Sequence, residues 1–197
     1  MLAPIASPQF VEEPLRRKRF AREEVNQMLD LGLFSGQRFE LIDGDLIDKM
    51  GQSPAHFAAI MHIAEWLRAI FGYLRVRTQG PIEVSVGDRD YSEPEPDIAV
   101  TAVASGIRDR HPRGDELILV IEVSDSSLRG DATTKRDLYA RADVPEYWIL
   151  DLRRSRIIVH RNPVQGVYTE IRIAEEGDIV STAAVPDTTM TVRDLMP

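Results

Sequence analysis

The chain has 197 residues, 43% of them hydrophobic, no cysteine and a formal net charge of −8 at pH 7. This length and apolar content suffice for one domain with a sizeable core, and the lack of cysteine excludes disulfides, thiolate metal sites and thiol nucleophiles. The acidic balance argues against a protein that coats nucleic acid nonspecifically, but it does not exclude a nucleic-acid enzyme whose carboxylates bind cations.

The N-terminal region shows no sustained periodicity. Residues 1–20 mix three prolines with the basic run at residues 16–19, which predicts a loosely ordered arm before a single domain over residues 21–197. No apolar run approaches the roughly 20 residues that a membrane span needs, and no signal-peptide pattern precedes the domain. We therefore expect a cytoplasmic protein without a membrane segment.

A short helix, a hairpin and a long helix are predicted for the first part of the domain. Residues 21–31 are amphipathic, and residues 38–49 form a hairpin at Asp43-Gly44, since both turn positions tolerate positive φ. Ser53 and Pro54 suit the cap and first position of a core helix. Its apolar residues at helical spacing are Phe57, Ile60, Met61, Ala64, Leu67, Ile70, Phe71 and Leu74.

The pattern then changes to strands. Strands are predicted at residues 75–79, 81–86, 97–103 and 117–124, and the last is a nearly continuous β-branched run typical of a central strand covered on both faces. Asp131 suits the cap of a helix to about residue 142, which Val144-Pro145 ends. Strands at 147–152 and 156–161 and weaker ones near 168–174 and 179–182 follow. This order predicts an α/β fold: a mixed sheet with the long helix and the Asp131 helix packed against it.

Glu122 is the most informative residue of the sequence. It stands inside the apolar strand at residues 117–124, where an ionised carboxylate is costly unless it is paired, protonated or bound to metal. The structural alternatives are an exposed edge position or an ion pair with an arginine.

Asp97 and Lys135 are candidate site residues because of their positions relative to Glu122. Asp97 opens a strand after a rigid Pro-containing approach; if the two strands are neighbours, both carboxylates could share a divalent cation such as Mg²⁺. Lys135 lies thirteen positions after Glu122 and shares a helix face with Asp131 and Tyr139. It could stabilise developing phosphoryl charge, or simply pair with Asp131 along the helix.

Glu40 and His56 are accessory candidates. Glu40 lies between apolar neighbours in the first hairpin strand, and His56 lies at the start of the long helix. Either could position water or complete a second metal site, and His56 could act as a base. A cross-strand pair for Glu40 and a helix-start contact for His56 are the structural alternatives. Gly-rich phosphate loops and the serine-hydrolase and zinc-protease motifs are absent from the sequence.

Several segments together resemble the Uma2 family of restriction-endonuclease-like proteins, a branch of the PD-(D/E)XK nuclease superfamily. The resemblance covers roughly residues 20–155. The matching segments are Phe39-Glu-Leu-Ile-Asp-Gly44, Ser53-Pro-Ala-His56, Glu95-Pro-Asp97-Ile, Val120-Ile-Glu122-Val-Ser-Asp-Ser-Ser127, Asp131 with Lys135 and Tyr139, and Val144-Pro-Glu-Tyr-Trp-Ile-Leu-Asp151.

The resemblance implies a restriction-endonuclease-like core, a mixed sheet flanked by helices with an N-terminal helix and hairpin. In such a core Asp97, Glu122 and the backbone carbonyl of Val123 would bind Mg²⁺ or Mn²⁺, Lys135 would assist the nucleophile, and Glu40 would be the accessory acid.

Two positions depart from the patterns to which the resemblance points. The superfamily lysine is expected two residues after the second acid, where this sequence has Ser124, so the assignment requires Lys135 to reach the site from the following helix. Asp143 stands where relatives often have Gly, which concerns a helix C-terminus rather than the chemistry.

The function implied is that of a metal-dependent endonuclease, in which a cation-activated water attacks a phosphodiester. DNA is the expected nucleic-acid partner, and a homodimer is expected because cutting both strands favours twofold symmetry. A noncatalytic binding or scaffold module that retains the nuclease fold stays open as the alternative, since fold does not establish activity and the net charge is negative.

Overall fold

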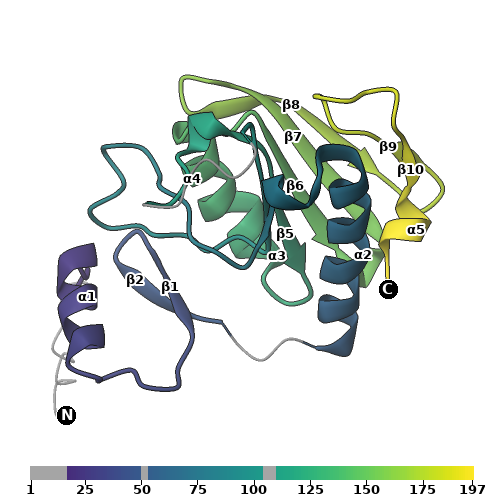
Figure 1. Ribbon diagram of the computed structural model, residues 1–197. Helices are drawn as coiled ribbons and strands as arrows, with labels where there is room; N and C mark the ends of the chain where they lie inside the picture. The colour runs from purple at the N-terminus through teal and green to yellow at the C-terminus, as the bar shows by residue number, and fades with distance from the viewer. Residues whose placement is uncertain (1–16, 50–52, 104–109) are drawn as a thin grey trace, which may run out of the picture.

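The computed structural model describes residues 17–49, 53–103 and 110–197, and a six-stranded sheet runs through its middle (Figure 1). The strands lie in the order β3-β4-β5-β6-β7-β8, and within this sheet only β5 and β6 are parallel. The bounds are β3 (Val76–Thr78), β4 (Ile98–Thr101), β5 (Leu117–Ser124), β6 (Glu146–Asp151), β7 (Arg156–Val164) and β8 (Val167–Ala174). The predicted mixed α/β sheet is therefore confirmed, and β5 is a central strand.

One face of the sheet is covered by α2 (Pro54–Phe71) and the C-terminal segment. That segment contains β9 (Ile179–Val180), β10 (Met190–Thr191) and α5 (Val192–Leu195). Leu119, Ile121 and Val123 of β5 point to this side and belong to its apolar cluster. Trp66 of α2 stacks on Trp148 of β6 with ring centroids 6.1 Å apart. These three residues of β5 thus form part of the core on this face of the sheet.

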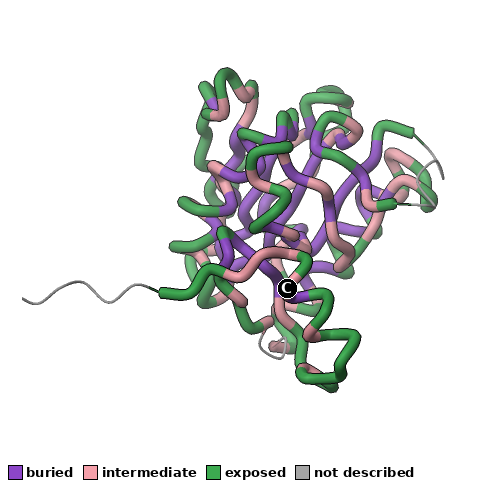
Figure 2. The backbone as a smooth tube through the Cα atoms, turned by 90° about the vertical axis from the view of Figure 1, so that its left-hand side faces the viewer, coloured by how far each residue is buried: buried purple, intermediate pink, exposed green. Residues whose placement is uncertain are grey.

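The opposite face is covered by a helical segment of three parts. It consists of α3 (Leu128–Gly130), a π-helical turn (Asp131–Lys135) and α4 (Arg136–Arg141). Leu138 and Tyr139 pack here against Val120 and Tyr147 of the sheet, in a cluster that also includes Ile42 of the N-terminal hairpin. Glu122 shares this face because side chains alternate along a strand. Figure 2 shows that the buried residues concentrate along the sheet between the two layers.

The N-terminal elements form a separate small layer. They are α1 (Arg22–Asp30), β1 (Phe39–Ile42) and β2 (Asp45–Asp48), and Figure 1 places them on the side of the molecule away from α2. Asp43 and Gly44 have φ of 51° and 83°, which confirms the predicted turn. Of the predicted arm, residues 1–16 lie outside the described residues. Lys18 and Arg19 form ion pairs with Glu24 and Asp43.

Several predicted elements differ from the structure. The helix predicted to begin at Asp131 begins at Leu128, so Asp131 lies within the helical segment and is not its cap. Residues 81–86 do not form a strand and have one isolated bridge, Glu83 to Arg113. On α2, Phe57 and Met61 are exposed, because the buried face also uses Ala59, Ile63 and Trp66. Leu74, predicted as part of this helix, is exposed in a short 3-10 turn.

Two local predictions are borne out in detail. The Ser53 hydroxyl accepts a hydrogen bond from the backbone N–H of His56, and Pro54 is the first residue of α2. Asp143 adopts a φ of 58°, which explains why glycine suits this position after a helix. Within the described ranges, no helix combines the length and apolar character that crossing a membrane requires.

Candidate active site

Asp97 and Glu122 are neighbours across two antiparallel strands. Ile98 pairs with Ile121, and continuing this register by one residue sets Asp97 opposite Glu122 on the face covered by α4. The backbone N–H of Val123 donates to Asp97 Oδ2 at 2.8 Å. Both acids are buried, with 4% of their surface exposed. The structure therefore brings together the two carboxylates that the sequence singled out.

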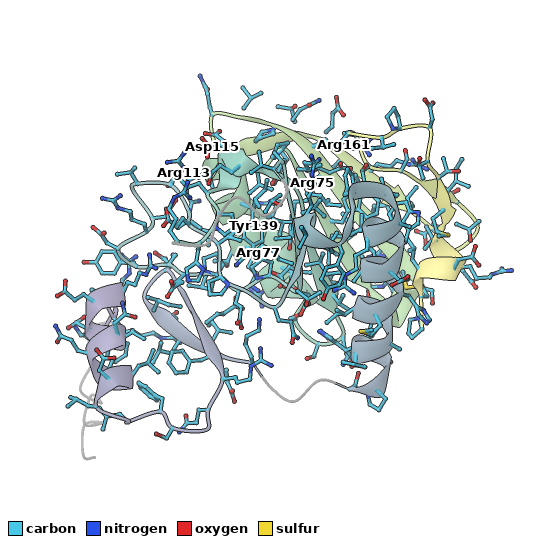
Figure 3. The ribbon with its side chains drawn as sticks, viewed as in Figure 1. Arg75, Arg77, Arg113, Asp115, Tyr139 and Arg161 are labelled. Atoms are coloured by element: carbon cyan, nitrogen blue, oxygen red, sulfur yellow. The ribbon has the colours of Figure 1, made fainter. Side chains whose placement is uncertain are left out.

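Lys135 and Tyr139 both bind the same oxygen of Glu122. Lys135 Nζ lies 2.9 Å from Glu122 Oε1, and the Tyr139 hydroxyl donates to that oxygen at 2.7 Å. Their common helix face, predicted from the spacing of four residues, thus turns toward β5. Figure 3 shows Tyr139 in the interior of the molecule. The two structural alternatives for Glu122, an exposed edge position and an ion pair with an arginine, are not found among the described residues.

Glu40 joins the site from the N-terminal hairpin. Its Oε1 lies 2.7 Å from Lys135 Nζ, and its Oε2 accepts a hydrogen bond from the backbone N–H of Glu95 at 3.1 Å. Lys135 consequently bridges two carboxylates from different layers of the molecule, so the alternative of a simple cross-strand pair for Glu40 is wrong. The ion pair with Asp131 considered for Lys135 is likewise replaced by contacts with Glu40 and Glu122 among the described residues.

The Asp131 carboxylate accepts hydrogen bonds from two serines. The hydroxyls of Ser124 and Ser127 both donate to Asp131 Oδ2, the latter at 2.6 Å. Ser124 stands where the resemblance seen in the sequence implies a lysine, and it is fully buried on the same face as Glu122. Here it fixes the following helical segment instead of supplying a cation. The positively charged side chain beside Glu122 is that of Lys135, one turn further along that segment.

His56 contacts Asp97 from the start of α2. Its Nε2 lies 3.3 Å from Asp97 Oδ1, so the hairpin, two strands and both helical layers all contribute to one site. The contact is more than the helix-start interaction considered from the sequence. It orients the Asp97 carboxylate, whose other oxygen is held by Val123.

The electrostatics of the site follow from burial. Burial raises the pKa of Glu122 to about 8; Lys135 opposes this shift, and the Asp97 carboxylate adds to it. Burial also opposes ionisation of Asp97, but its contacts with His56 and Val123 outweigh this and lower the pKa of Asp97. Burial would lower the pKa of Lys135, yet Glu122 and Glu40 hold it above its ordinary value. Two buried acids in close register therefore repel each other, a repulsion that a bound cation would relieve.

These residues line a pocket of about 800 Å³. The acidic side chains in its lining are Glu40, Asp43, Asp45, Asp48, Asp97, Glu122, Asp125 and Asp131. The Lys and Arg side chains are Arg38, Lys49, Arg129 and Lys135. Acids thus outnumber cations in a pocket large enough for a nucleotide-sized group.

The donor set fits a hard divalent cation. Over residues 17–49, 53–103 and 110–197, no three His, Asp or Glu side chains converge as metal ligands. Asp97 and Glu122 nevertheless offer two carboxylates, and the Val123 carbonyl points toward the Asp97 strand because its N–H does. Mg²⁺ typically takes one or two carboxylates and completes its shell with water and substrate oxygens. This oxygen set suits such an ion.

Sequence reasoning assigned no role at the site to two of its polar residues, Ser124 and Gln79. Gln79 lies directly after β3 and lines the pocket. A buried serine on the Glu122 side of β5 follows from strand alternation, so this signal was readable. Gln79 could be placed at the site only once it was known which strand lies beside that of Asp97.

The sheet topology and the buried carboxylate pair with its lysine define a protein of the nuclease-like fold. A crystal structure of a nuclease described as putative and belonging to DUF820, from Anabaena variabilis ATCC 29413, superposes with a TM-score of 0.65 at 17% sequence identity. The match covers 85% of this chain and 96% of that one. The sequence also matches the family Uma2, described as "Putative restriction endonuclease", over residues 22–193. The protein belongs to the Uma2 family. No curated protein matches the sequence.

Proposed function

We propose that this protein is a metal-dependent endonuclease that hydrolyses phosphodiester bonds, with DNA as its substrate. The observation that carries the proposal is the pairing of Asp97 and Glu122 across β4 and β5 with Lys135 on Glu122, at the wall of one pocket. Membership in a family described as restriction endonucleases supports the reaction class. Fold alone would not, because one fold hosts many functions.

Asp97, Glu122 and the Val123 carbonyl would hold Mg²⁺ or Mn²⁺. When bound, the cation would polarise the phosphoryl group and lower the pKa of water at the site. His56 and the Val123 N–H fix the orientation of Asp97, so this carboxylate is preorganised. Tyr139 does the same for Glu122.

Lys135 would stabilise the negative charge that develops on the phosphoryl oxygens and assist the attacking water. An ammonium has three N–H donors, and Glu40 and Glu122 take two of them. Within the part of the chain that the structure describes, no partner takes the third, which would donate to the substrate. Glu40, itself held by the Glu95 N–H, keeps Lys135 in place, and Asp131 adds negative potential that maintains its charge.

The acidic lining of the pocket supports cation dependence. Without a cation, the excess of carboxylates would repel a phosphodiester. With a cation bound, the local field changes sign where the phosphate would lie. The same excess of acids is the observation that favours the second candidate function, a noncatalytic binding module.

We also propose that the protein works as a cytoplasmic homodimer. Twofold symmetry would present two pockets to the two antiparallel strands of a duplex. Light scattering coupled to size-exclusion chromatography would measure the mass directly, and a mass of 22.2 kDa at working concentration would contradict the dimer.

Cleavage assays with matched variants test the proposed reaction. Supercoiled plasmid, single-stranded DNA and RNA would be incubated with the wild-type protein in Mg²⁺ and in Mn²⁺, beside Glu122→Ala and Lys135→Ala purified identically. We expect cleavage by the wild-type protein alone and none in EDTA. Undiminished cleavage by either variant would overturn the assigned site. Cation binding without cleavage of any nucleic acid would favour the binding module.

A further inference from the structure

A third polar residue continues the row formed by Asp97 and Glu122. Thr78 pairs with Ile98, so the next register position sets Gln79 opposite Asp97, and the Gln79 N–H donates to the Asp97 carbonyl at 3.0 Å. Gln79, which follows β3, Asp97, which precedes β4, and Glu122 within β5 are therefore side by side in register. All three line the pocket.

The Gln79 side chain has an unusual environment. Its amide nitrogen Nε2 is buried and has no hydrogen-bond partner among the residues that the structure describes. A buried unpaired donor costs stability, so native proteins keep few of them. Gln79 also has a φ of 51°, a left-handed conformation uncommon for a residue with a side chain. Both features are unfavourable for folding, and both occur beside the carboxylate pair.

The neighbouring groups indicate what this donor would bind. Asp97 and Glu122 are acceptors already held by Val123, Lys135 and Tyr139. None of these contacts uses the Gln79 amide. A side-chain N–H cannot ligate a cation, but it can donate to an anionic oxygen. A phosphoryl oxygen of a strand whose phosphate lies against Asp97 and Glu122 would meet that donor.

Arg77 also has an unpaired buried nitrogen, but its position does not suit substrate binding. It lies two residues earlier on β3 and is labelled in Figure 3, and the nitrogen is Nε. However, Arg77 is the register partner of Ala99 on β4, and Ala99 belongs to the apolar cluster. Arg77 is not part of the pocket lining. Among the described residues of the pocket lining, Gln79 is the one whose buried side-chain nitrogen has no hydrogen-bond partner.

We propose that Gln79 is a substrate-binding residue whose side-chain amide donates a hydrogen bond to a phosphoryl oxygen of the nucleic acid strand. This inference rests on the proposed nuclease function. The bond forms with the substrate and persists through the reaction, so it acts on binding more than on the chemical step. Gln79 takes no part in holding the cation.

The test uses Gln79→Met, which keeps the length of the side chain and removes the donor. Thr78→Met is the matched control, because Thr78 is the adjacent residue, is exposed, and points to the other face of β3. Three quantities are compared with the wild-type protein: Mn²⁺ affinity without nucleic acid, by electron paramagnetic resonance; KM and kcat on the substrate that the wild type cleaves; and the melting temperature.

For Gln79→Met we expect KM to rise roughly 10- to 100-fold, the effect of losing a hydrogen bond to a charged group. Mn²⁺ affinity should stay within about twofold, since the donor is not a ligand. The melting temperature should be unchanged or higher, because an unsatisfied buried donor is removed. Thr78→Met should leave all three quantities at wild-type values.

Three outcomes for Gln79→Met would overturn the inference while leaving the nuclease function standing: an unchanged KM, a fall in Mn²⁺ affinity in step with activity, or a lower melting temperature. The second would mean that the Gln79 carbonyl serves the cation, and the third that the side chain is structural. If the wild-type protein neither binds nor cleaves nucleic acid, the proposed function and this inference fall together.

Discussion

Lys135 Nζ lies 2.9 Å from Glu122 Oε1, although the lysine belongs to the helical segment that follows the strand of the acid. The segment contains a π-helical turn at Asp131–Lys135, and such turns are frequent at functional sites. The Ser124 and Ser127 hydroxyls fix this turn through Asp131. A lysine from the helical segment thereby reaches the carboxylate of Glu122 on the preceding strand.

Replacing Lys135 with methionine should strongly destabilise the fold. The variant leaves Glu122 and Glu40 buried without their cation, and removing one partner of a buried ion pair typically costs about 3–5 kcal/mol. Urea unfolding monitored by circular dichroism would measure the loss. The control is Lys18→Met, which breaks an exposed pair with Glu24 and should have a much smaller effect on stability. Equal losses in the two variants would contradict the buried bridge.

The pH dependence of Lys135→Met gives a second check. Burial raises the folded-state pKa of Glu122, and Lys135→Met removes the cationic side chain that opposes this shift. For a carboxyl with a raised folded pKa, stability is present below its unfolded pKa and is lost as the pH rises through the folded one. The deficit relative to wild type should therefore be smaller at pH 5 than at pH 8. A deficit that grows toward acid pH would be inconsistent with this account.

Cations should stabilise the wild-type protein through Glu122. At a cation concentration about a hundredfold above Kd, binding adds about 2.7 kcal/mol, which corresponds to a rise in Tm of roughly 5–10 °C for a chain of this size. Differential scanning fluorimetry in Mn²⁺ against EDTA would measure the rise, and Glu122→Ala should abolish it. Glu23→Ala, an exposed acid of α1, serves as the control. Persistence of the full rise in Glu122→Ala would remove this residue from the cation site.

Ser124→Ala should separate the roles of Ser124 and Lys135. The variant deprives the buried Asp131 of one of two hydroxyl donors, so we expect a stability loss of about 1–2 kcal/mol. Cleavage by the folded variant should persist, because the proposed positively charged side chain at the site is that of Lys135 and not a side chain at position 124. The measurement is kcat at a temperature well below the Tm of the variant. Loss of turnover comparable to that of Lys135→Ala, in a folded protein, would assign chemistry to Ser124.

His160 should make the fold sensitive to acid. Its ring stacks on Tyr147 at a centroid distance of 5.4 Å, and burial lowers the pKa of His160 to about 4. The folded pKa lies below the unfolded value of about 6.5, so stability is complete above about pH 6.5 and is lost as the pH falls toward 4, by at most about 3 kcal/mol.

The comparison variant is His160→Phe, which keeps an aromatic ring between Tyr147 and Tyr168 and removes the titration. Urea midpoints between pH 7.5 and pH 4.5 should fall less steeply for the variant than for the wild type. Carboxylates contribute to both slopes and cancel in the difference. Identical slopes would show that His160 does not titrate in this interval.

The sequence predicted the elements whose signals are local. The Asp43-Gly44 turn, the Ser53 cap and the apolar run of β5 each depend on a few neighbouring residues, and all three were found. Local signals misled at residues 81–86, where an alternating pattern finds no partner strand beyond one bridge. They also placed the start of the helix at Asp131, whose carboxylate accepts from Ser124 and Ser127 and caps nothing.

For the candidate site, the sequence by itself determined the residue types: a carboxylate that a buried strand cannot leave uncompensated, a second acid at a strand start, and a lysine on the following helix. Only the tertiary structure decided that Asp97 and Glu122 share one sheet face, because register depends on which strands pair. It also decided that Glu40 binds Lys135 and that Gln79 extends the row. Contacts between residues far apart in the chain leave no local pattern, since they form only when the sheet assembles and its layers pack.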